Sequence, residues 1–230
     1  MVFGRCGRVV LFGLALLAAP PAPAREKPAP PKPAPFTLTV TGDITPELAP
    51  VVGRLTTVFY ETYPALVERF ENPKKPAPRH VRLVLKSGLK VPAYCSGSDI
   101  TVSVEWVQKH PDDVGLLTHE LTHAVQAYPV SDPSWLTEGL ADYARHVHGP
   151  KKQPGWELPP RLSVKQSYKD SYRVTARFLL WLDARHPGTV DKLHRRMQDR
   201  EFAPSDFGTI TGCTVDELWA ECVRDLGKKP

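Results

Sequence analysis

The prolines of this 230-residue chain are distributed unevenly, and their positions decide which part of it can form a folded domain. Eight of the 25 prolines lie within residues 20–35, and the segment 25–35 (REKPAPPKPAP) contains almost no apolar side chain larger than alanine or proline. Because such a segment has little to bury, we expect it to be an extended, polyproline-like linker. The folded domain is therefore expected to begin near Phe36.

The first 24 residues have the pattern of a secretory signal peptide. Arg5 and Arg8 precede an apolar run over residues 9–19, and Ala22-Pro23-Ala24 provides the small residues of a cleavage site. The run of about eleven residues is short for a transmembrane helix, which needs about 20. We expect cleavage after Ala24, a mature chain that is secreted or periplasmic, and no stable membrane insertion after cleavage. An uncleaved anchor is the alternative.

The basic character of the chain comes from its N-terminal segments. The formal net charge is +5, of which the two arginines of the signal peptide supply +2 and the linker 25–35 another +2. The domain 36–230 is thus close to neutral, which gives no indication of a nucleic-acid-binding surface. With 41% hydrophobic and 24% charged residues, the composition is that of a globular protein. We expect a single domain over residues 36–230 and a monomer.

Residue patterns divide this domain into a first half that contains the strands and a second half that is helical. Strands are expected at 36–41, 80–86 and 99–104, where apolar and polar residues alternate. Helices are expected at 45–70, from Pro111 onward, and at 135–148, 171–184, 189–198 and 214–226. Four prolines within residues 149–170 indicate a long exposed loop. This order predicts an α+β fold with a small mixed or antiparallel sheet.

The domain contains three cysteines, Cys95, Cys213 and Cys222. Thr214 and Glu217 form a capping box that begins the last expected helix. Cys213 and Cys222 would then stand about 13 Å apart along that helix, too far for a disulfide. Any disulfide has to involve Cys95, and otherwise all three cysteines are small buried hydrophobic residues.

The segment His119-Glu120-Leu121-Thr122-His123 lies inside the helix expected from Pro111. Residues four apart lie on one helix face, so that the rings of His119 and His123 can bind the same ion. Neutral imidazole nitrogens bind zinc at about 2.0–2.1 Å, which suits this spacing. Glu120 lies beside the first histidine and can act as a general base on a water molecule activated by the ion. Two histidines that merely cap or pack a helix are the alternative.

A catalytic zinc generally has three protein ligands and one open position. Glu138, on the next expected helix, is the candidate third ligand, and Asp142 lies one turn further on the same face. A carboxylate at Asp142 can accept a hydrogen bond from the outer nitrogen of a ligand histidine. Asp132, in a turn-forming Asp-Pro pair, is the rival third ligand. The longer motif with a third histidine is excluded, because Gln126 and Pro129 stand at its remaining positions.

Five blocks of the sequence have a recognisable pattern: 93–103 (AYCSGSDITVS), 119–126 (HELTHAVQ), 135–145 (WLTEGLADYAR), 171–179 (SYRVTARFL) and 214–219 (TVDELW). Together they resemble the basic secretory protein family of plants and bacteria. Members of this family are regarded as zinc-dependent peptidases of the HExxH type. The resemblance covers roughly residues 93–226 and implies a zincin-like fold, zinc on His119 and His123, and catalysis by Glu120. Analogy with other metallopeptidases supports Glu138 as the third ligand.

From the residues and this resemblance we expect a secreted zinc metallopeptidase that hydrolyses peptide bonds in a protein or peptide substrate. Tyr172 is the candidate donor to the oxyanion, with core packing as its alternative. The segment 99–104 is the expected sheet edge to which an extended substrate adds as a strand. Two other functions remain open: an exported zinc-containing binding module without catalysis, and a zinc hydrolase that acts on the peptide part of a cell wall.

Overall fold

A computed structural model describes residues 36–170 and 172–227. The expected signal peptide 1–24 and linker 25–35 lie outside the described residues. Among the helices of the described part, none has both the length and the apolar character needed to cross a bilayer.

Four strands form one sheet in the order β1-β2-β4-β3. They are β1 (Thr37–Gly42), β2 (His80–Lys86), β3 (Ala93–Ser96) and β4 (Asp99–Ser103). The strands β1, β2 and β4 are parallel, and β3 is antiparallel to β4. In β2 the buried side chains of Val81, Leu83 and Leu85 alternate with more exposed ones. The sheet therefore buries one face, as the alternating pattern of the sequence requires.

The position of β4 contradicts one prediction from the sequence. The segment 99–104 was expected at the sheet edge, but β4 pairs with β2 on one side and with β3 on the other. The edge strand beside β4 is β3, which was not predicted because its four residues are too few to show a clear alternation.

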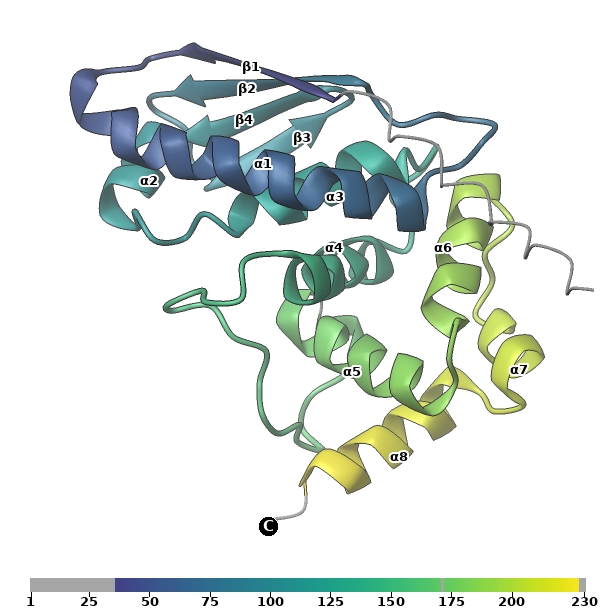
Figure 1. The fold of residues 1–230 in the computed structure, drawn as a ribbon. Coiled ribbons are helices and arrows are strands. Elements are labelled where there is room, and N and C mark those ends of the chain that lie inside the picture. Colours follow the sequence, from purple (N-terminus) through teal and green to yellow (C-terminus); the bar gives the residue numbers. More distant parts are fainter. Residues whose placement is uncertain (1–35, 171, 228–230) are drawn as a thin grey trace, which may run out of the picture. The chain divides into compact units, whose positions relative to one another are not determined.

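Two helices, α1 (Ala49–Phe70) and α3 (Leu116–Gln126), lie side by side against the sheet (Figure 1). The face that α1 turns inward contains Leu55, Phe59, Leu66 and Phe70, all fully buried at helical spacing. Helix α3 contacts β3 and β4, so this helix is fixed between the sheet and the helical half of the chain.

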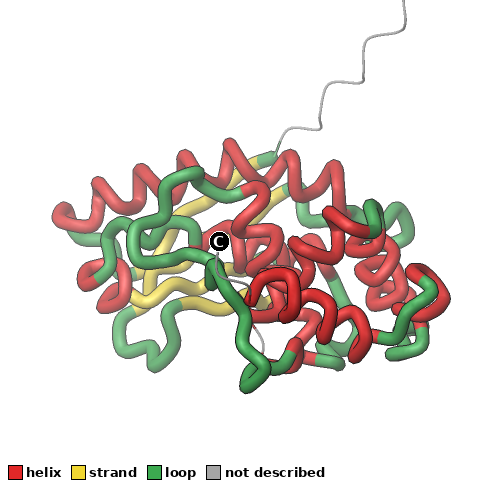
Figure 2. The backbone as a smooth tube through the Cα atoms, turned by 90° about the horizontal axis from the view of Figure 1, so that it is seen from below, coloured by secondary structure: helices red, strands yellow, loops and turns green. Residues whose placement is uncertain are grey.

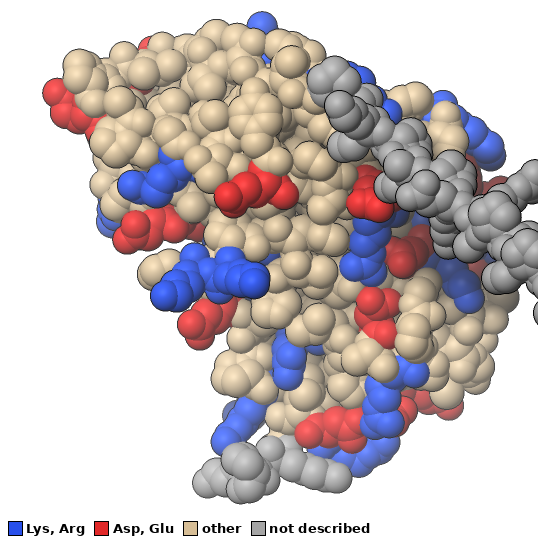
Figure 3. Space-filling view, viewed as in Figure 1, with Lys and Arg blue, Asp and Glu red and all other residues tan. Residues whose placement is uncertain are grey.

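The remaining regular elements of the described chain are all helices, which are joined by loops of varied length (Figure 2). They are α2 (Val104–Lys109), α4 (Ser134–His148), α5 (Tyr172–Arg185), α6 (Thr189–Asp199), α7 (Asp206–Thr211) and α8 (Val215–Gly227), with 3-10 turns at Pro46–Leu48 and Tyr168–Asp170. Aromatic rings of Trp135, Tyr168, Phe178, Phe207 and Trp219 pack together between α4, α5, α7 and α8. On the face in Figure 3, basic and acidic side chains are interspersed, in keeping with a domain close to neutral.

The α+β class with a small mixed sheet and a helical C-terminal half is confirmed. Two local predictions are wrong. The helix with the two histidines begins at Leu116 and not at Pro111. The loop 149–170 is not fully exposed, because Leu158, Leu162 and Tyr168 are buried in the core. The prolines of this loop prevent helices and strands, but they do not prevent its apolar side chains from packing into the core.

The three cysteines of the described residues are free. Cys222 is buried, whereas Cys95 and Cys213 are partly buried. The expectation of buried thiols therefore holds in full only for Cys222.

Candidate metal centre

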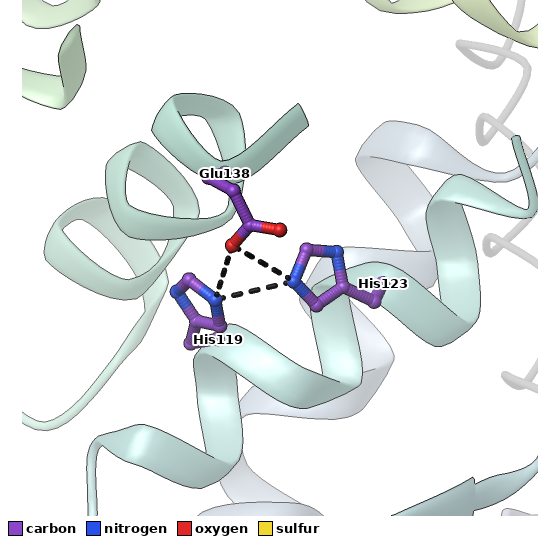
Figure 4. A group of neighbouring side chains, drawn as sticks. All are labelled: His119, His123 and Glu138. Atoms are coloured by element: carbon purple, nitrogen blue, oxygen red, sulfur yellow. Dashed lines mark hydrogen bonds and ion pairs between the residues drawn. The ribbon is translucent and has the colours of Figure 1, made fainter. Parts of the chain in front are cut away.

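Helix α3 presents His119 and His123 on one side, with their ring centroids 4.8 Å apart and their planes nearly perpendicular. The helix is held in place by Leu117, Leu121 and Val125, which are fully buried on its other faces. Helix α4 packs against α3 and directs Glu138 toward the two rings (Figure 4). Two helices thus supply the three side chains, as the sequence pattern suggested.

Three atoms of these side chains converge on one point (Figure 4). His119 Nε2 lies 3.1 Å from His123 Nε2 and 3.2 Å from Glu138 Oε2, and His123 Nε2 lies 3.5 Å from the same oxygen. Among the described residues, these three side chains form a group that could hold a metal ion. Asp132, the rival third ligand, is not part of the group.

The outer nitrogen of each ring faces a side-chain oxygen. His119 Nδ1 lies 2.7 Å from Asp142 Oδ1, and His123 Nδ1 lies 2.7 Å from Gln126 Oε1. Both oxygens only accept hydrogen bonds, so each Nδ1 has to carry the proton. In their neutral forms both rings then turn a lone pair at Nε2 toward the carboxylate of Glu138. Three electron-rich atoms at these distances repel one another unless a proton or a cation lies between them.

The separations also match those of ligands around a small tetrahedral ion. Two ligand atoms placed 2.0–2.1 Å from such an ion lie about 3.3–3.4 Å apart. The observed separations of 3.1, 3.2 and 3.5 Å bracket this value. Two imidazoles and one carboxylate are also a common donor set of catalytic metal sites. The residues present therefore fit a bound metal ion.

The charges around His119 favour its protonated form. Burial disfavours a charge on the ring, but the carboxylates of Asp142 and Glu138 outweigh burial and raise the pKa of His119 to about 10. Burial likewise opposes the charge of Glu138, yet the neighbouring side chains of His119 and His123 outweigh burial and lower its pKa to about 2. Without a metal, one proton of His119 partly neutralises the cluster, and a metal ion has to displace it.

These side chains line a groove of about 1480 Å³ that also contains Glu120 and Tyr172. Glu120 is buried, and burial raises the pKa of its carboxyl group against the opposing effect of His119 and His123. A raised pKa brings a carboxylate closer to the value that suits proton transfer near neutral pH. The groove thus places a potential base among the residues of the metal centre.

Tyr172 stands at the first position of α5, and 54% of its surface is exposed. Its ring lies nearly parallel to that of His119, with 6.1 Å between centroids. Burial and the charges of Glu138, Asp142 and Glu120 raise the pKa of the phenol, so the hydroxyl keeps its proton at neutral pH and can donate it in a hydrogen bond. Its φ of 48° lies in the left-handed region, which is costly for a residue with a side chain.

Segments distant in sequence contribute to the lining of the groove. Ala93, Tyr94 and Cys95 belong to the edge strand β3. Trp156 of the loop 149–170 also lines the groove and packs over the guanidinium of Arg145, with 4.0 Å between that group and the ring centroid. The groove therefore joins an open sheet edge to the candidate metal centre.

The six predicted site residues all line this groove: His119, Glu120, His123, Glu138, Asp142 and Tyr172. The sequence reasoning missed Gln126, which it used only to exclude a longer motif. Its position three residues after His123 on the same helix was an available signal. It also missed the edge strand β3.

A family model described as "Peptidase of plants and bacteria" matches residues 36–222 of the chain. The match extends the likeness seen in the sequence to the first two strands and to α1. No curated protein and no solved structure matches the chain.

Proposed function

The chain belongs to the basic secretory proteins, the peptidase family of plants and bacteria, and from this premise we propose that it is a zinc-dependent peptidase. In this proposal, His119, His123 and Glu138 hold the zinc ion, and Glu120 is the general base. The observation that carries the proposal is the convergence of two imidazole nitrogens and one carboxylate oxygen within 3.1–3.5 Å, beside a buried glutamate in the same groove.

Each proposed ligand residue has a definite task. His119 and His123 supply neutral ring nitrogens, and Glu138 supplies a negative oxygen that offsets part of the charge of the ion. A zinc ion at this position polarises a peptide carbonyl and lowers the pKa of water. Three protein ligands leave one position open, which is typical of catalytic and not of structural zinc sites. The described residues offer no fourth ligand in the group.

The remaining steps belong to side chains of the chain itself. Glu120, whose carboxylate lines the same groove, takes the proton from the attacking water and passes it to the leaving amine. The hydroxyl of Tyr172 donates a hydrogen bond to the carbonyl oxygen, on which negative charge develops. Asp142 holds the outer nitrogen of His119 and thereby keeps the ring in the orientation that binds the ion.

We propose that the substrate is an extended protein or peptide segment that pairs with β3. This strand pairs with β4 on one side, and it lines the groove together with His119 and Glu120. An extended peptide can add to such an edge through main-chain hydrogen bonds. The strand that accepts the peptide in this mode is β3 and not the segment 99–104, which is paired on both sides.

We further propose that the protein is exported, that its signal peptide is cleaved after Ala24, and that residues 36–230 are one zincin-like domain. The basic start, the short apolar run and the Ala-x-Ala ending support the export signal. The N-terminal sequence of the protein recovered from culture medium or periplasm tests the cleavage site.

The decisive test of catalysis is Glu120→Gln, which keeps the size of the side chain but removes its basicity. We expect turnover of a mixed peptide library to fall by about 10²–10⁴-fold, with the zinc content unchanged. Glu61→Gln is the matched control, because Glu61 is exposed on α1 away from the groove. A Glu120→Gln variant as active as the Glu61→Gln control would refute the assignment. Zinc-loaded wild-type protein that cleaves nothing would favour a binding module.

A further inference from the structure

Gln126 connects the candidate metal centre to the backbone of the neighbouring helix. It is the last residue of α3 and is only 1% exposed. Its Oε1 lies 2.7 Å from His123 Nδ1, and its Nε2 donates a hydrogen bond of 3.0 Å to the backbone carbonyl of Thr137. Thr137 immediately precedes Glu138, so one side chain reaches both a histidine and the segment that carries the carboxylate.

The two contacts fix the direction of the amide and, with it, the tautomer of the ring. A backbone carbonyl can only accept, so the NH₂ group of Gln126 has to face Thr137 and its oxygen has to face His123. That oxygen can only accept, so the proton of the neutral ring of His123 lies on Nδ1. The lone pair then lies on Nε2, the atom that faces His119 and Glu138.

The backbone of Gln126 is itself held by a second buried amide. Gln198, on α6, donates from Nε2 to the carbonyls of Gln126 at 3.3 Å and of Phe70 at 3.1 Å. Its own Oε1 accepts a hydrogen bond of 2.8 Å from Arg195. The end of α3 is therefore held against α6, while the side chain of Gln126 is held by its own two hydrogen bonds and its burial.

We propose that Gln126 is a positioning residue for the metal centre: it orients His123, fixes the tautomer that binds through Nε2, and ties this ring to the segment of Glu138. The inference rests on the proposed function in that it assumes a metal at this centre. The outer nitrogen of His123 thus has a neutral amide as its partner, whereas that of His119 has the carboxylate of Asp142. The neutral partner orients its ring without adding a second buried negative charge.

The first test is the zinc affinity of Gln126→Leu, measured by competition with a chelator of known affinity. Leucine fills similar space but offers neither an acceptor to His123 nor a donor to Thr137. Loss of such an outer partner typically weakens metal binding 10–100-fold, and we expect a loss in this range. Leu218→Ala is the control: it removes a fully buried side chain of α8, so it destabilises the fold while zinc affinity stays unchanged.

The second test does not depend on a variant that folds. In zinc-loaded wild-type protein, a long-range ¹H–¹⁵N correlation spectrum identifies the ring nitrogen that carries the proton. We expect the proton of His123 on Nδ1, with slow exchange against solvent. A proton on Nε2, zinc affinity in Gln126→Leu equal to the wild type, or a failure of the wild type to bind zinc would overturn the inference. Protein that passes both tests but cleaves no peptide would refute only the proposed peptidase activity.

Discussion

Zinc binding at neutral pH should release about one proton from the protein, and His119 is its source. The carboxylates of Asp142 and Glu138 raise the pKa of this histidine to about 10. At pH 7 the ring is then protonated in all but about one molecule in a thousand. Because a protonated imidazole cannot bind a metal, the ion has to displace this proton.

The cost of this displacement sets the pH dependence of the affinity. The pKa of His119, about 10, lies three units above pH 7. Removing its proton at pH 7 therefore weakens the apparent zinc affinity about a thousandfold, or by about 4 kcal/mol. The affinity should therefore rise about tenfold for each pH unit between 7 and 9, and level off above about 10. Calorimetric titration in buffers of different ionisation enthalpy counts the released protons, and a competing chelator gives the affinity at each pH.

Asp142→Asn is the control for the origin of the proton. Its side chain still places an oxygen near His119 Nδ1 but no longer carries the charge that raises the pKa of the ring. Proton release measured at pH 8–9 should fall in this variant, whereas release from a water molecule at the metal would not change. If wild-type protein releases no proton at pH 7, or if its affinity is flat between pH 7 and 9, the electrostatic account of the centre is wrong.

Two further variants test the groove and the packing behind it. Tyr172→Phe should lower kcat about 10²–10³-fold with unchanged zinc affinity, as expected for loss of an oxyanion donor; an unchanged kcat in steady-state kinetics would leave Tyr172 only a packing role. Gly139→Ala should destabilise the fold by about 1–3 kcal/mol, because the new Cβ would lie 2.2 Å from Cγ2 of Thr175. Replacing glycine by alanine in a helix is by itself stabilising, by up to about 1 kcal/mol. A rise in Tm would therefore show that α4 and α5 move apart at little cost and that the predicted clash is wrong.

The regular elements were predictable where local patterns agree with the tertiary structure. The strand β2 has the predicted limits, and α5, α6 and α8 agree with the predicted ranges to within one residue at each end. The capping box of α8 is confirmed, since Glu217 accepts from the backbone nitrogen of Thr214 at 2.8 Å and Thr214 Oγ1 accepts in return at 3.3 Å. Such signals depend on residues close in sequence, so they can be seen without the fold.

Elements that depend on distant contacts were missed or misplaced. The short segments β3, α2 and α7 have four to six residues each, too few for a periodic pattern. The helix expected from Pro111 begins only at Leu116. Asp113, which lies between these positions, is held outside the helix, because its carboxylate accepts hydrogen bonds from Arg145 at 2.5 Å and from the indole of Trp106 at 2.9 Å. Neither partner can be identified from spacing alone.

Two polar contacts between α4 and the α3 region flank the candidate metal centre. The connections run from Arg145 to Asp113 at one end, 2.5 Å, and from Gln126 to the carbonyl of Thr137 at the other, 3.0 Å. The converging atoms of His119, His123 and Glu138 lie between them. Productive site geometry tolerates displacements of only about 0.5 Å, whereas a helix pair with a large apolar interface stays packed after far larger changes. Loss of the Gln126 connection should therefore reduce metal affinity well before it reduces the stability of the fold. The pair of Arg145 and Asp113 differs, because its side chains are only 6% and 16% exposed, and loss of one partner leaves a buried charge that also destabilises the fold.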